Sequence, residues 1–260
     1  MIEKDHIYHE NCLDTLSKLE NESINHVITS PPYNMNLRIM GDRYCSRQIV
    51  KEFSTKYDGF DDNLPQEEYF NLHNKILGEL LRVTKGYVFY NIQVVTGNKP
   101  SVFKLMGEFS EKIKEIVIWD KTSAQPAMGE CVMNSEFEFL IILSNNKKDA
   151  MSRQFKEANF ARGTLSNVWR IKRGKKISKE HGATFPEELV EKILVNFTKE
   201  GEIIYDPFFG TGTVGIVSKK LGRHYIGSEL LKKYIDIAEE RLNSNKTLQT
   251  LTMLDNGKNN

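Results

Sequence analysis

The alternation of short apolar runs with amphipathic segments constrains the fold of this chain more than any other feature. Apolar runs of strand length lie at 26–28, 87–90, 115–119, 137–143, 203–205 and 224–227. Segments with apolar residues at helical spacing lie at 13–19, 65–83, 102–109, 184–198, 214–221 and 230–243. Strands that alternate with helices of this length form sheets covered by helices on both faces. The sequence therefore predicts an α/β fold with a mostly parallel sheet.

One strand end stands out, because the apolar run at 26–28 leads directly into Thr29-Ser30-Pro31-Pro32-Tyr33-Asn34. Two consecutive prolines fix their own φ angles and donate no backbone hydrogen bond. The first also restricts Ser30 to an extended conformation. The result is a rigid corner at a strand's carboxyl end, where open α/β sheets bind ligands. Such a corner can aim a carbonyl and a hydroxyl at an exocyclic amino group while Tyr33 covers a flat base. A proline-rich turn with a core tyrosine is the alternative.

A second motif follows the strand at 203–205, which ends at Asp206 and leads into a turn containing Gly210 and Gly212. Glycines let a ligand approach the backbone closely, and the helix that follows offers free N–H groups. The turn has neither a full GxGxxG pattern nor a P-loop lysine, and Asp206 would repel a phosphate. Glu229 ends the next strand, about 20 residues on, where an acid meets ribose hydroxyls in Rossmann-type folds. A nucleoside with an ammonium group and no phosphate fits S-adenosylmethionine.

The two motifs resemble those of the amino-directed DNA methyltransferases of the permuted β class, the N4-cytosine/N6-adenine family. In that class an (S/D/N)PP(Y/F) motif precedes the cofactor motif. Ser30-Pro31-Pro32-Tyr33 matches the first, and Asp206-Pro207-Phe208 with Gly210-Thr211-Gly212-Thr213 matches the second. Residues 181–189 resemble the segment before the cofactor motif, and the resemblance spans residues 7–243. It implies a Rossmann-like methyltransferase fold with circularly permuted motif order and S-adenosylmethionine as cofactor.

The resemblance also implies roles for individual residues. The Pro31 carbonyl and the Ser30 hydroxyl accept the hydrogens of the target amine, and Tyr33 stacks on a flipped base. The expected catalytic residues are Ser30, Pro31, Pro32 and Tyr33. The expected cofactor-binding residues are Asn11, Thr29, His181, Phe185, Asp206, Pro207, Phe208, Gly210, Thr211, Gly212, Thr213 and Glu229. Asn11 stands where the family has an aspartate that touches adenine. Asparagine can still bond an adenine edge, and it can also cap the helix that follows.

Methyl transfer from a sulfonium needs positioning rather than a metal or a covalent intermediate. None of the three cysteines lies in a Pro-Cys motif, which argues against a C5-cytosine enzyme. Ser30 and the pair Phe185-Pro186 resemble the N4-cytosine members. The adenine-N6 members more often carry Asp or Asn at the first position of the (S/D/N)PP(Y/F) motif. Methylation of adenine at N6 stays the alternative. Two further alternatives are an RNA or protein-amide methyltransferase and an inactive DNA-binding module.

The net charge is only +1, so any surface for DNA must be local. Residues 145–180 hold eleven Lys and Arg against three acids, which predicts a target-recognition insertion. The segment 35–63 mixes basic and aromatic residues beside the catalytic corner, which predicts a loop that helps to hold an extruded base. A solvated loop is the alternative for both. The residues predicted to contact DNA are Arg38, Arg43, Arg47, Arg162, Arg170, Arg173, Lys175 and Lys176.

The length of 260 residues suits one methyltransferase domain, residues 1–260, with a disordered polar tail at 245–260. The cysteines, Cys12, Cys45 and Cys131, form no metal-ligand pattern and indicate reduced thiols in the cytosol. No long apolar run or signal peptide is seen, so a soluble cytoplasmic protein is expected. The expected partner is double-stranded DNA and not a membrane. Class members often form homodimers and can accompany a restriction endonuclease, and the sequence decides neither.

Overall fold

The computed structural model describes residues 2–34, 64–125, 130–174 and 185–256, together with strands β3 (Arg38–Met40) and β4 (Arg43–Cys45). For these two strands, and for residues 124–125 and 245–256, it describes the backbone alone. Most of the predicted loop at 35–63 and residues 175–184 therefore lie outside the described residues.

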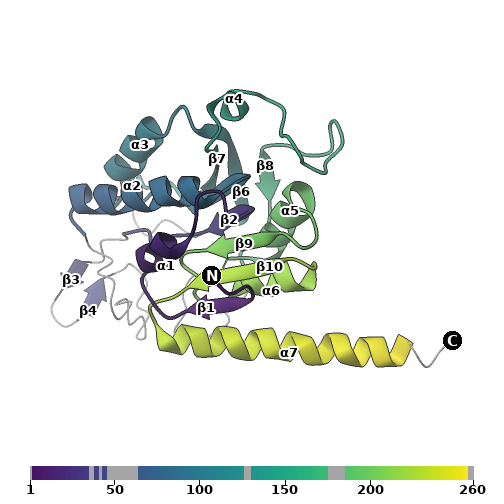
Figure 1. The fold of residues 1–260 in the computed structure, drawn as a ribbon. Coiled ribbons are helices and arrows are strands. Elements are labelled where there is room, and N and C mark those ends of the chain that lie inside the picture. The colour runs from purple at the N-terminus through teal and green to yellow at the C-terminus, as the bar shows by residue number, and fades with distance from the viewer. Residues whose placement is uncertain are drawn as a thin grey trace.

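The described residues form one large mixed sheet of eight strands (Figure 1). Its order is β1 (His6–Tyr8), β10 (His224–Ser228), β9 (Ile203–Asp206), β2 (His26–Thr29), β5 (Tyr87–Ile92), β7 (Ser135–Ser144), β6 (Ile113–Gln125) and β8 (Val168–Arg170). The first five strands are parallel to one another. Strand β7 is antiparallel to both β5 and β6, and β8 is parallel to β6. The predicted α/β fold with a mostly parallel sheet is confirmed.

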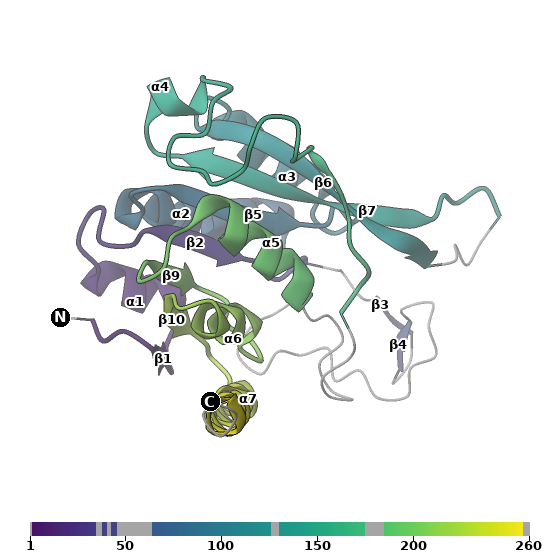
Figure 2. The ribbon, with the colours of Figure 1, turned by 90° about the vertical axis from the view of Figure 1, so that its right-hand side faces the viewer.

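Helices cover both faces of this sheet (Figures 1 and 2). One layer contains α1 (Cys12–Lys18), α2 (Gln66–Val83) and α3 (Lys99–Glu108), and the other α5 (Glu187–Phe197), α6 (Thr213–Lys220) and α7 (Lys232–Asn256). Because successive strand residues point to opposite faces, Val27 packs into the core under the first layer and Ile28 into the core under the second. Both are fully buried, which explains why the strands read as continuous apolar runs.

The strand directions decide where a ligand can bind. Strands β1, β10, β9, β2 and β5 all finish at the same edge of the sheet. Strand β7 runs the opposite way, so its beginning meets that edge, where Phe139 pairs with Ile92 at the end of β5. This carboxyl edge, defined by the carboxyl ends of the parallel strands, brings together Thr29, Asp206 and the first residues of β7.

Residues 145–174 contain secondary structure that the sequence analysis did not predict. This stretch contains α4 (Lys147–Ala150) and strand β8, which joins the main sheet. Trp169 pairs with Trp119 and is only 1% exposed, so it ties the stretch to the core. Exposed Val168 and Arg170 alternate with buried Trp169 and Ile171, the pattern of a half-buried strand. The abundance of charge around these residues concealed that alternation.

The last helix is also longer than predicted, since α7 continues to Asn256 instead of ending at residue 243. The predicted helix ended at residue 243, and the three residues at this point, Asn243, Ser244 and Asn245, are weak helix formers. No proline or glycine follows until Gly257, so nothing in this segment breaks a helix. The C-terminal part of α7 extends past the sheet (Figure 1).

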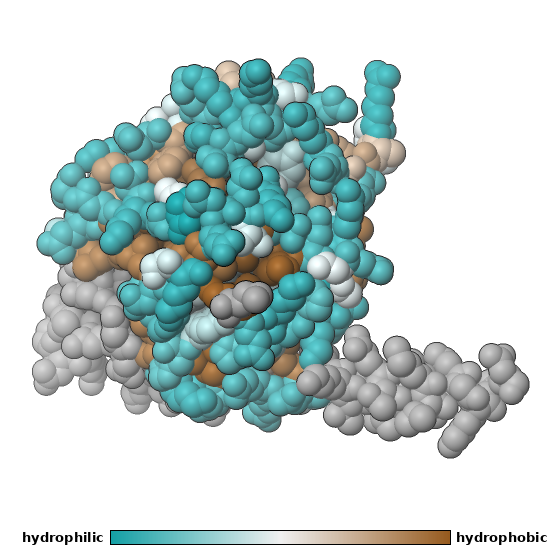
Figure 3. Space-filling model, in the orientation of Figure 1, coloured by the Kyte–Doolittle hydropathy of each residue, from teal (hydrophilic) through white to brown (hydrophobic). Residues whose placement is uncertain are grey.

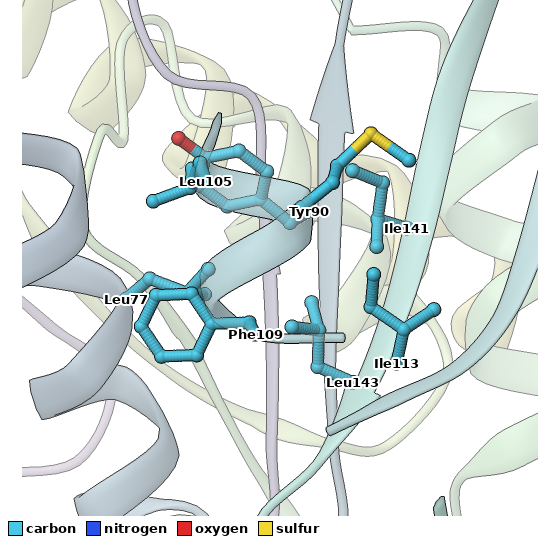
Figure 4. Close-up of a pocket in the computed structure, with 8 residues that line it drawn as sticks. Leu77, Tyr90, Leu105, Phe109, Ile113, Ile141 and Leu143 are labelled. Carbon is cyan, nitrogen blue, oxygen red and sulfur yellow. The ribbon is translucent and has the colours of Figure 1, made fainter. Parts of the chain in front are cut away.

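A small cavity lies between α2, α3 and the sheet (Figure 4). It is lined by Leu77, Tyr90, Leu105, Met106, Phe109, Ile113, Ile141 and Leu143. This lining offers no charged group, so the cavity is a packing feature of the core rather than a cofactor site. Polar side chains cover most of the face shown in Figure 3. Within the described residues, no helix is long and apolar enough to cross a membrane.

Candidate active site

The corner after β2 is held from behind by Asn34. This residue adopts a left-handed conformation with φ 54°, which asparagine tolerates better than most residues, and it is 1% exposed. Its amide nitrogen donates to the carbonyls of Leu64 at 2.9 Å and Gly97 at 2.8 Å. Its amide oxygen accepts from Leu64 N at 2.7 Å. Asn34 therefore fastens the corner to the start of α2 and the loop before α3.

Two more side chains fix the corner from the same side. The Tyr69 hydroxyl, on α2, donates to the Pro32 carbonyl at 2.8 Å. The Asn98 amide donates to the Tyr33 carbonyl at 2.8 Å. Asn34, Tyr69 and Asn98 were not among the predicted site residues. Asn34 directly follows the motif, but nothing in the sequence indicates that residues 64–69 and 97–98 lie against it.

The two predicted motifs meet in space. Thr29 ends β2, and its hydroxyl donates to Asp206 Oδ1 at 2.8 Å across 177 residues of sequence. Backbone N–H of Phe208 donates to the same oxygen at 3.0 Å. Thr29 is fully buried and Asp206 is 5% exposed. The catalytic corner and the glycine turn are therefore parts of one edge, as the order of strands requires.

Two acids dominate the electrostatics beside the glycine turn. Burial raises the pKa of Asp206 to about 7, and the nearby charge of Glu229 adds to this while the Thr29 and Phe208 hydrogen bonds oppose it. Burial also raises the pKa of Glu229, whose carboxylate accepts from Gly210 N at 2.8 Å and Leu231 N at 2.9 Å. No Lys or Arg of the described residues forms an ion pair with either acid. The pair thus fits a ligand that brings a positive charge and hydroxyl donors.

Three glycines have a structural role that the sequence did not indicate. A Cβ on Gly227 would lie 2.4 Å from the Phe209 ring, and one on Gly215 would lie 2.5 Å from it. Gly212, with φ 82°, would meet Ala238 of α7 at 2.8 Å. These glycines form a slot for Phe209, which is 3% exposed. A Cβ at position 212 would therefore point toward α7, and the predicted approach of a ligand to the Gly212 backbone stays a prediction.

The remaining predicted cofactor residues have mixed placements. Asn11 caps α1, because its amide oxygen accepts from Leu13 N at 2.9 Å, and its predicted contact with adenine stays a prediction. Pro207, Thr211 and Thr213 are buried in the turn, and Phe208 and Gly210 are half-buried. Phe185 is half-buried, and its ring lies edge-on to Trp119 with centroids 6.5 Å apart. His181 lies outside the described residues.

A polar network that the sequence did not predict extends from the corner into the sheet. The Ser30 and Tyr33 hydroxyls are 2.8 Å apart, and Tyr33 donates to Glu138 Oε2 of β7 at 2.8 Å. The Asn91 amide of β5 donates to Tyr33 Oη at 2.9 Å and to Glu138 Oε2 at 2.7 Å. Lys121 of β6 donates to Glu138 Oε1 at 3.2 Å. The sequence signal was a lone acid between Phe137 and Phe139 in an apolar strand.

The members of this network that lie in the sheet are buried, whereas Ser30 and Tyr33 at the corner are half-buried. Asn91 is fully buried, Lys121 is 1% exposed and Glu138 is 7% exposed. Burial, followed by the Glu138 charge, raises the pKa of Tyr33 well above its ordinary value. Burial lowers the pKa of Lys121, and the Glu138 charge opposes that change. Tyr33 is therefore a neutral phenol beside an ion pair.

Three of the predicted DNA-contact residues have described side chains, and these three do not lie together. Arg170 pairs with Asp120 on the catalytic side of β8, and the charge of the exposed Arg173 acts on Lys121. Arg162 is exposed but follows Asn159, which bonds to Asn196 at the end of α5, near the opposite edge. The side chains of Arg38 and Arg43 are not described, and Arg47, Lys175 and Lys176 lie outside the described residues.

Within the described residues, no group of three or more His, Cys, Asp or Glu side chains could hold a metal ion. The basic residues of α4 and the loop after it lie at the opposite edge. There the buried Lys114, near the start of β6, donates to the carbonyls of Asp149, Ser152 and Gln154 at 2.6, 2.8 and 2.7 Å. The predicted basic surface thus divides into a part near Ser30 and a part far from it.

Comparison with known proteins shows the family of this chain. A family model described as DNA methylase, for the N6 and N4 enzymes, matches residues 24–240. The type II methyltransferase M2.DpnII of Streptococcus pneumoniae is 30% identical over 91% of this chain and 88% of its own length. M.HinfI of Haemophilus influenzae is 29% identical over 89% of this chain, which spans only 66% of that enzyme. The chain belongs to the family of amino-directed DNA methylases.

As a member of this family, the chain is an enzyme that methylates an exocyclic amino group of DNA, on N6 of adenine or N4 of cytosine. Solved structures share its fold at lower identity. The PvuII DNA methyltransferase, named as cytosine-N4-specific, matches with a TM-score of 0.69 at 17% identity, over 93% of this chain and 87% of its own. M1.HpyAVI, solved as a complex with S-adenosylmethionine, matches with a TM-score of 0.58 at 20% identity, over 91% of this chain and 99% of its own.

Proposed function

We propose that this enzyme transfers a methyl group from S-adenosylmethionine to N4 of a flipped cytosine within a specific site in double-stranded DNA. The observation that carries the proposal is the hydrogen bond between Thr29 and Asp206, which joins the Ser30 corner to the glycine turn. A methyl donor on one side of this contact and an amine on the other would be held within reach of each other. The names of the curated relatives, type II methyltransferases, support action at a specific site.

The donor site fits the chemistry of S-adenosylmethionine. Asp206 Oδ1 already accepts from Thr29 and Phe208, so its other oxygen is available to an ammonium group. Glu229 accepts from two backbone N–H groups and keeps lone pairs for ribose hydroxyls. A positive ligand charge would offset the cost of holding the buried Asp206 carboxylate close to the half-buried Glu229 carboxylate. S-adenosylmethionine supplies the electrophilic methyl, and the chain supplies its placement.

The acceptor site is the corner at Ser30. The Pro31 carbonyl and the Ser30 hydroxyl accept the two hydrogens of the target amine, which turns the nitrogen lone pair toward the donor. An exocyclic amine on an aromatic ring is a weak nucleophile until its lone pair is freed in this way. The Pro32 carbonyl is taken by Tyr69, and this bond fixes the peptide next to the Pro31 carbonyl. Tyr33 stacks on the base through its ring while its hydroxyl points into the network of Asn91 and Glu138.

Two sequence features favour cytosine over adenine as the target base. Ser30 occupies the first position of the catalytic motif, and Phe185-Pro186 precedes the cofactor motif; both resemble the N4-cytosine members of the family. N6 of adenine is the alternative target. We would test this with duplex genomic DNA that carries no prior amino methylation. After incubation with labelled S-adenosylmethionine, the DNA is digested and the methylated nucleoside is identified by mass spectrometry. We expect N4-methylcytosine. N6-methyladenine would replace the cytosine assignment, and label in RNA but not DNA would reject the proposal.

A further inference from the structure

The hydrogens of the Ser30–Tyr33 pair can be placed by counting donors and acceptors. A phenol has one hydrogen, and Tyr33 gives it to Glu138 Oε2 at 2.8 Å. The contact of 2.8 Å between the two hydroxyls must therefore be donated by Ser30 to Tyr33 Oη. Ser30 Oγ then has no hydrogen left for another partner and can only accept, as it does over a longer contact of 3.4 Å from the Asn91 amide. The bond to Tyr33 thus fixes Ser30 as an acceptor toward the target amine.

Asn91 supports the same assignment. Its amide has two hydrogens, and the two short contacts are to Tyr33 Oη and Glu138 Oε2, at 2.9 and 2.7 Å. Both neighbours must accept for both contacts to form. The Asn91 amide oxygen is buried with no hydrogen-bond partner, as expected if the amide is turned to serve a carboxylate. Lys121 donates to the other Glu138 oxygen at 3.2 Å, so both oxygens of the carboxylate are held by hydrogen bonds.

From this geometry we infer that Glu138, acting through Tyr33 and Ser30, accepts the proton that the target amine loses during methyl transfer. The inference rests on the proposed function, since Ser30 must touch the amine. The nitrogen forms its bond to the methyl carbon as the carbon–sulfur bond breaks and sulfur keeps that electron pair. One N–H proton passes to Ser30 Oγ, the Ser30 proton to Tyr33 Oη, and the Tyr33 proton to Glu138. Each oxygen of the relay gains one proton and, except for the carboxylate, loses one.

The direction of this transfer agrees with the acidities of the groups. An aromatic amine that has just gained a methyl carries a positive charge and is a far stronger acid than a carboxylic acid. The Tyr33 phenolate is not a resting state, because burial and the Glu138 charge raise the pKa of Tyr33 well above its ordinary value. The charged and titratable groups that face Glu138 are Tyr33 from the corner and Lys121 from β6, with Arg173 acting on Lys121. Glu138 touches no substrate and is a positioning residue.

Replacement of Tyr33 by Phe tests the relay, because it removes only the hydroxyl and keeps the ring that stacks on the base. We expect Tyr33→Phe to lower the single-turnover methylation rate by about 100-fold, within the range of proton-transfer catalysis. The Kd for S-adenosylmethionine and for DNA should stay unchanged. Tyr87→Phe is the matched control, since its hydroxyl contacts the Lys156 carbonyl at 3.3 Å in a different part of the fold. A Tyr33→Phe rate within threefold of wild type would overturn the inference.

A double-mutant cycle separates a relay from independent structural roles. Tyr33→Phe and Glu138→Gln interrupt the same chain, so the double variant should be no slower than the slower single variant. A double variant whose loss of rate equals the product of the two single losses would contradict the relay. If Glu138→Gln does not fold because Lys121 is left unpaired, Glu138→Gln with Lys121→Met replaces it in the cycle.

These outcomes differ from a failure of the proposed function. A wild-type enzyme that methylates no DNA would reject that function. A wild-type enzyme that methylates DNA, with a Tyr33→Phe variant of equal rate, would reject the relay alone.

Discussion

At the scale of single residues, the role of each buried polar group at the site depends on whether its hydrogen-bonding atoms all have partners within the protein. Thr29, Asn34 and Tyr69 have partners within the protein and serve to hold the corner. Asp206 is buried with its second oxygen unclaimed and a second acid nearby, so it is costly until a ligand binds. Its replacement should therefore change stability and ligand binding in opposite directions.

The first prediction concerns Asp206→Asn and the pH dependence of stability. Because burial raises the folded-state pKa to about 7, the folded protein takes up this proton more readily than the unfolded chain. Wild-type stability thus rises as pH falls from 8 toward 5, and the cost of the buried charge is fully present above pH 7. Asp206→Asn should raise Tm over wild type by more at pH 8 than at pH 5. Thermal unfolding checks this, with Glu108→Gln, an exposed acid, as control. Equal differences at both pH values would contradict the account.

The second prediction concerns donor binding by the same variant. The Asp206 carboxylate attracts an ammonium group, so wild-type affinity for S-adenosylmethionine should weaken as pH falls below 7 and the carboxyl is protonated. Asp206→Asn should bind at least 10-fold more weakly at pH 8 and should show little dependence on pH, because the loss of one charged hydrogen bond costs roughly 1.5–3 kcal/mol. Isothermal titration calorimetry measures both quantities. A variant that keeps the wild-type pH dependence would show that another group controls binding.

At the scale of elements, the strands that bear the site were predictable and most of their supports were not. Apolar runs located β2, β5, β9 and β10, because strands covered on both faces contain little else. The short β8 was missed, since Trp169 is its only buried residue and the segment after it is rich in exposed Lys and Arg. The Asn34 and Asn98 anchors were missed as well. Asparagines in loops are common, and only the tertiary fold decides which of them bond across distant segments.

The third prediction tests the slot around Phe209. Gly227→Ala places a Cβ 2.4 Å from the ring, so either the ring or β10 must shift. Overpacking of this kind costs about 1–3 kcal/mol in the free energy of unfolding. Gly78→Ala is the matched control, because a Cβ there meets nothing within 4 Å in α2. That change should instead stabilise the protein by about 0.5–1 kcal/mol. Chemical denaturation of both variants measures the change in the free energy of unfolding. A change of the same sign in both variants would contradict the packing argument.

At the scale of the whole molecule, described basic residues that lie close in sequence are found at opposite edges of the sheet. The sequence indicated a basic stretch at 145–180 but treated it as one surface. Because β7 and β8 run in opposite directions, residues 145–150 after β7 lie at the opposite edge, and β8 ends at the edge of the sheet that holds Ser30. Only strand topology, which the sequence does not give, separates these two parts.

The fourth prediction follows from this division. Arg173→Ala should weaken binding to duplex DNA and reduce the slope of log affinity against log salt by about 1, as expected for one lost phosphate contact. Lys148→Ala is the matched control, since Lys148 is exposed in α4 at the opposite edge. It should leave both the affinity and the slope unchanged. Fluorescence anisotropy over a salt series measures both quantities, and equal losses in the two variants would show that the whole stretch binds DNA.

The most direct test of the central claim, that the Ser30 corner and the glycine turn form one methyl-transfer site, is a crystal structure with S-adenosylhomocysteine and duplex DNA. We predict the ligand ammonium within hydrogen-bonding distance of Asp206, its ribose at Glu229, and the amino nitrogen of a flipped base within hydrogen-bonding distance of Ser30 Oγ. A ligand bound away from Asp206, or a flipped base whose amine does not reach Ser30, would contradict the account.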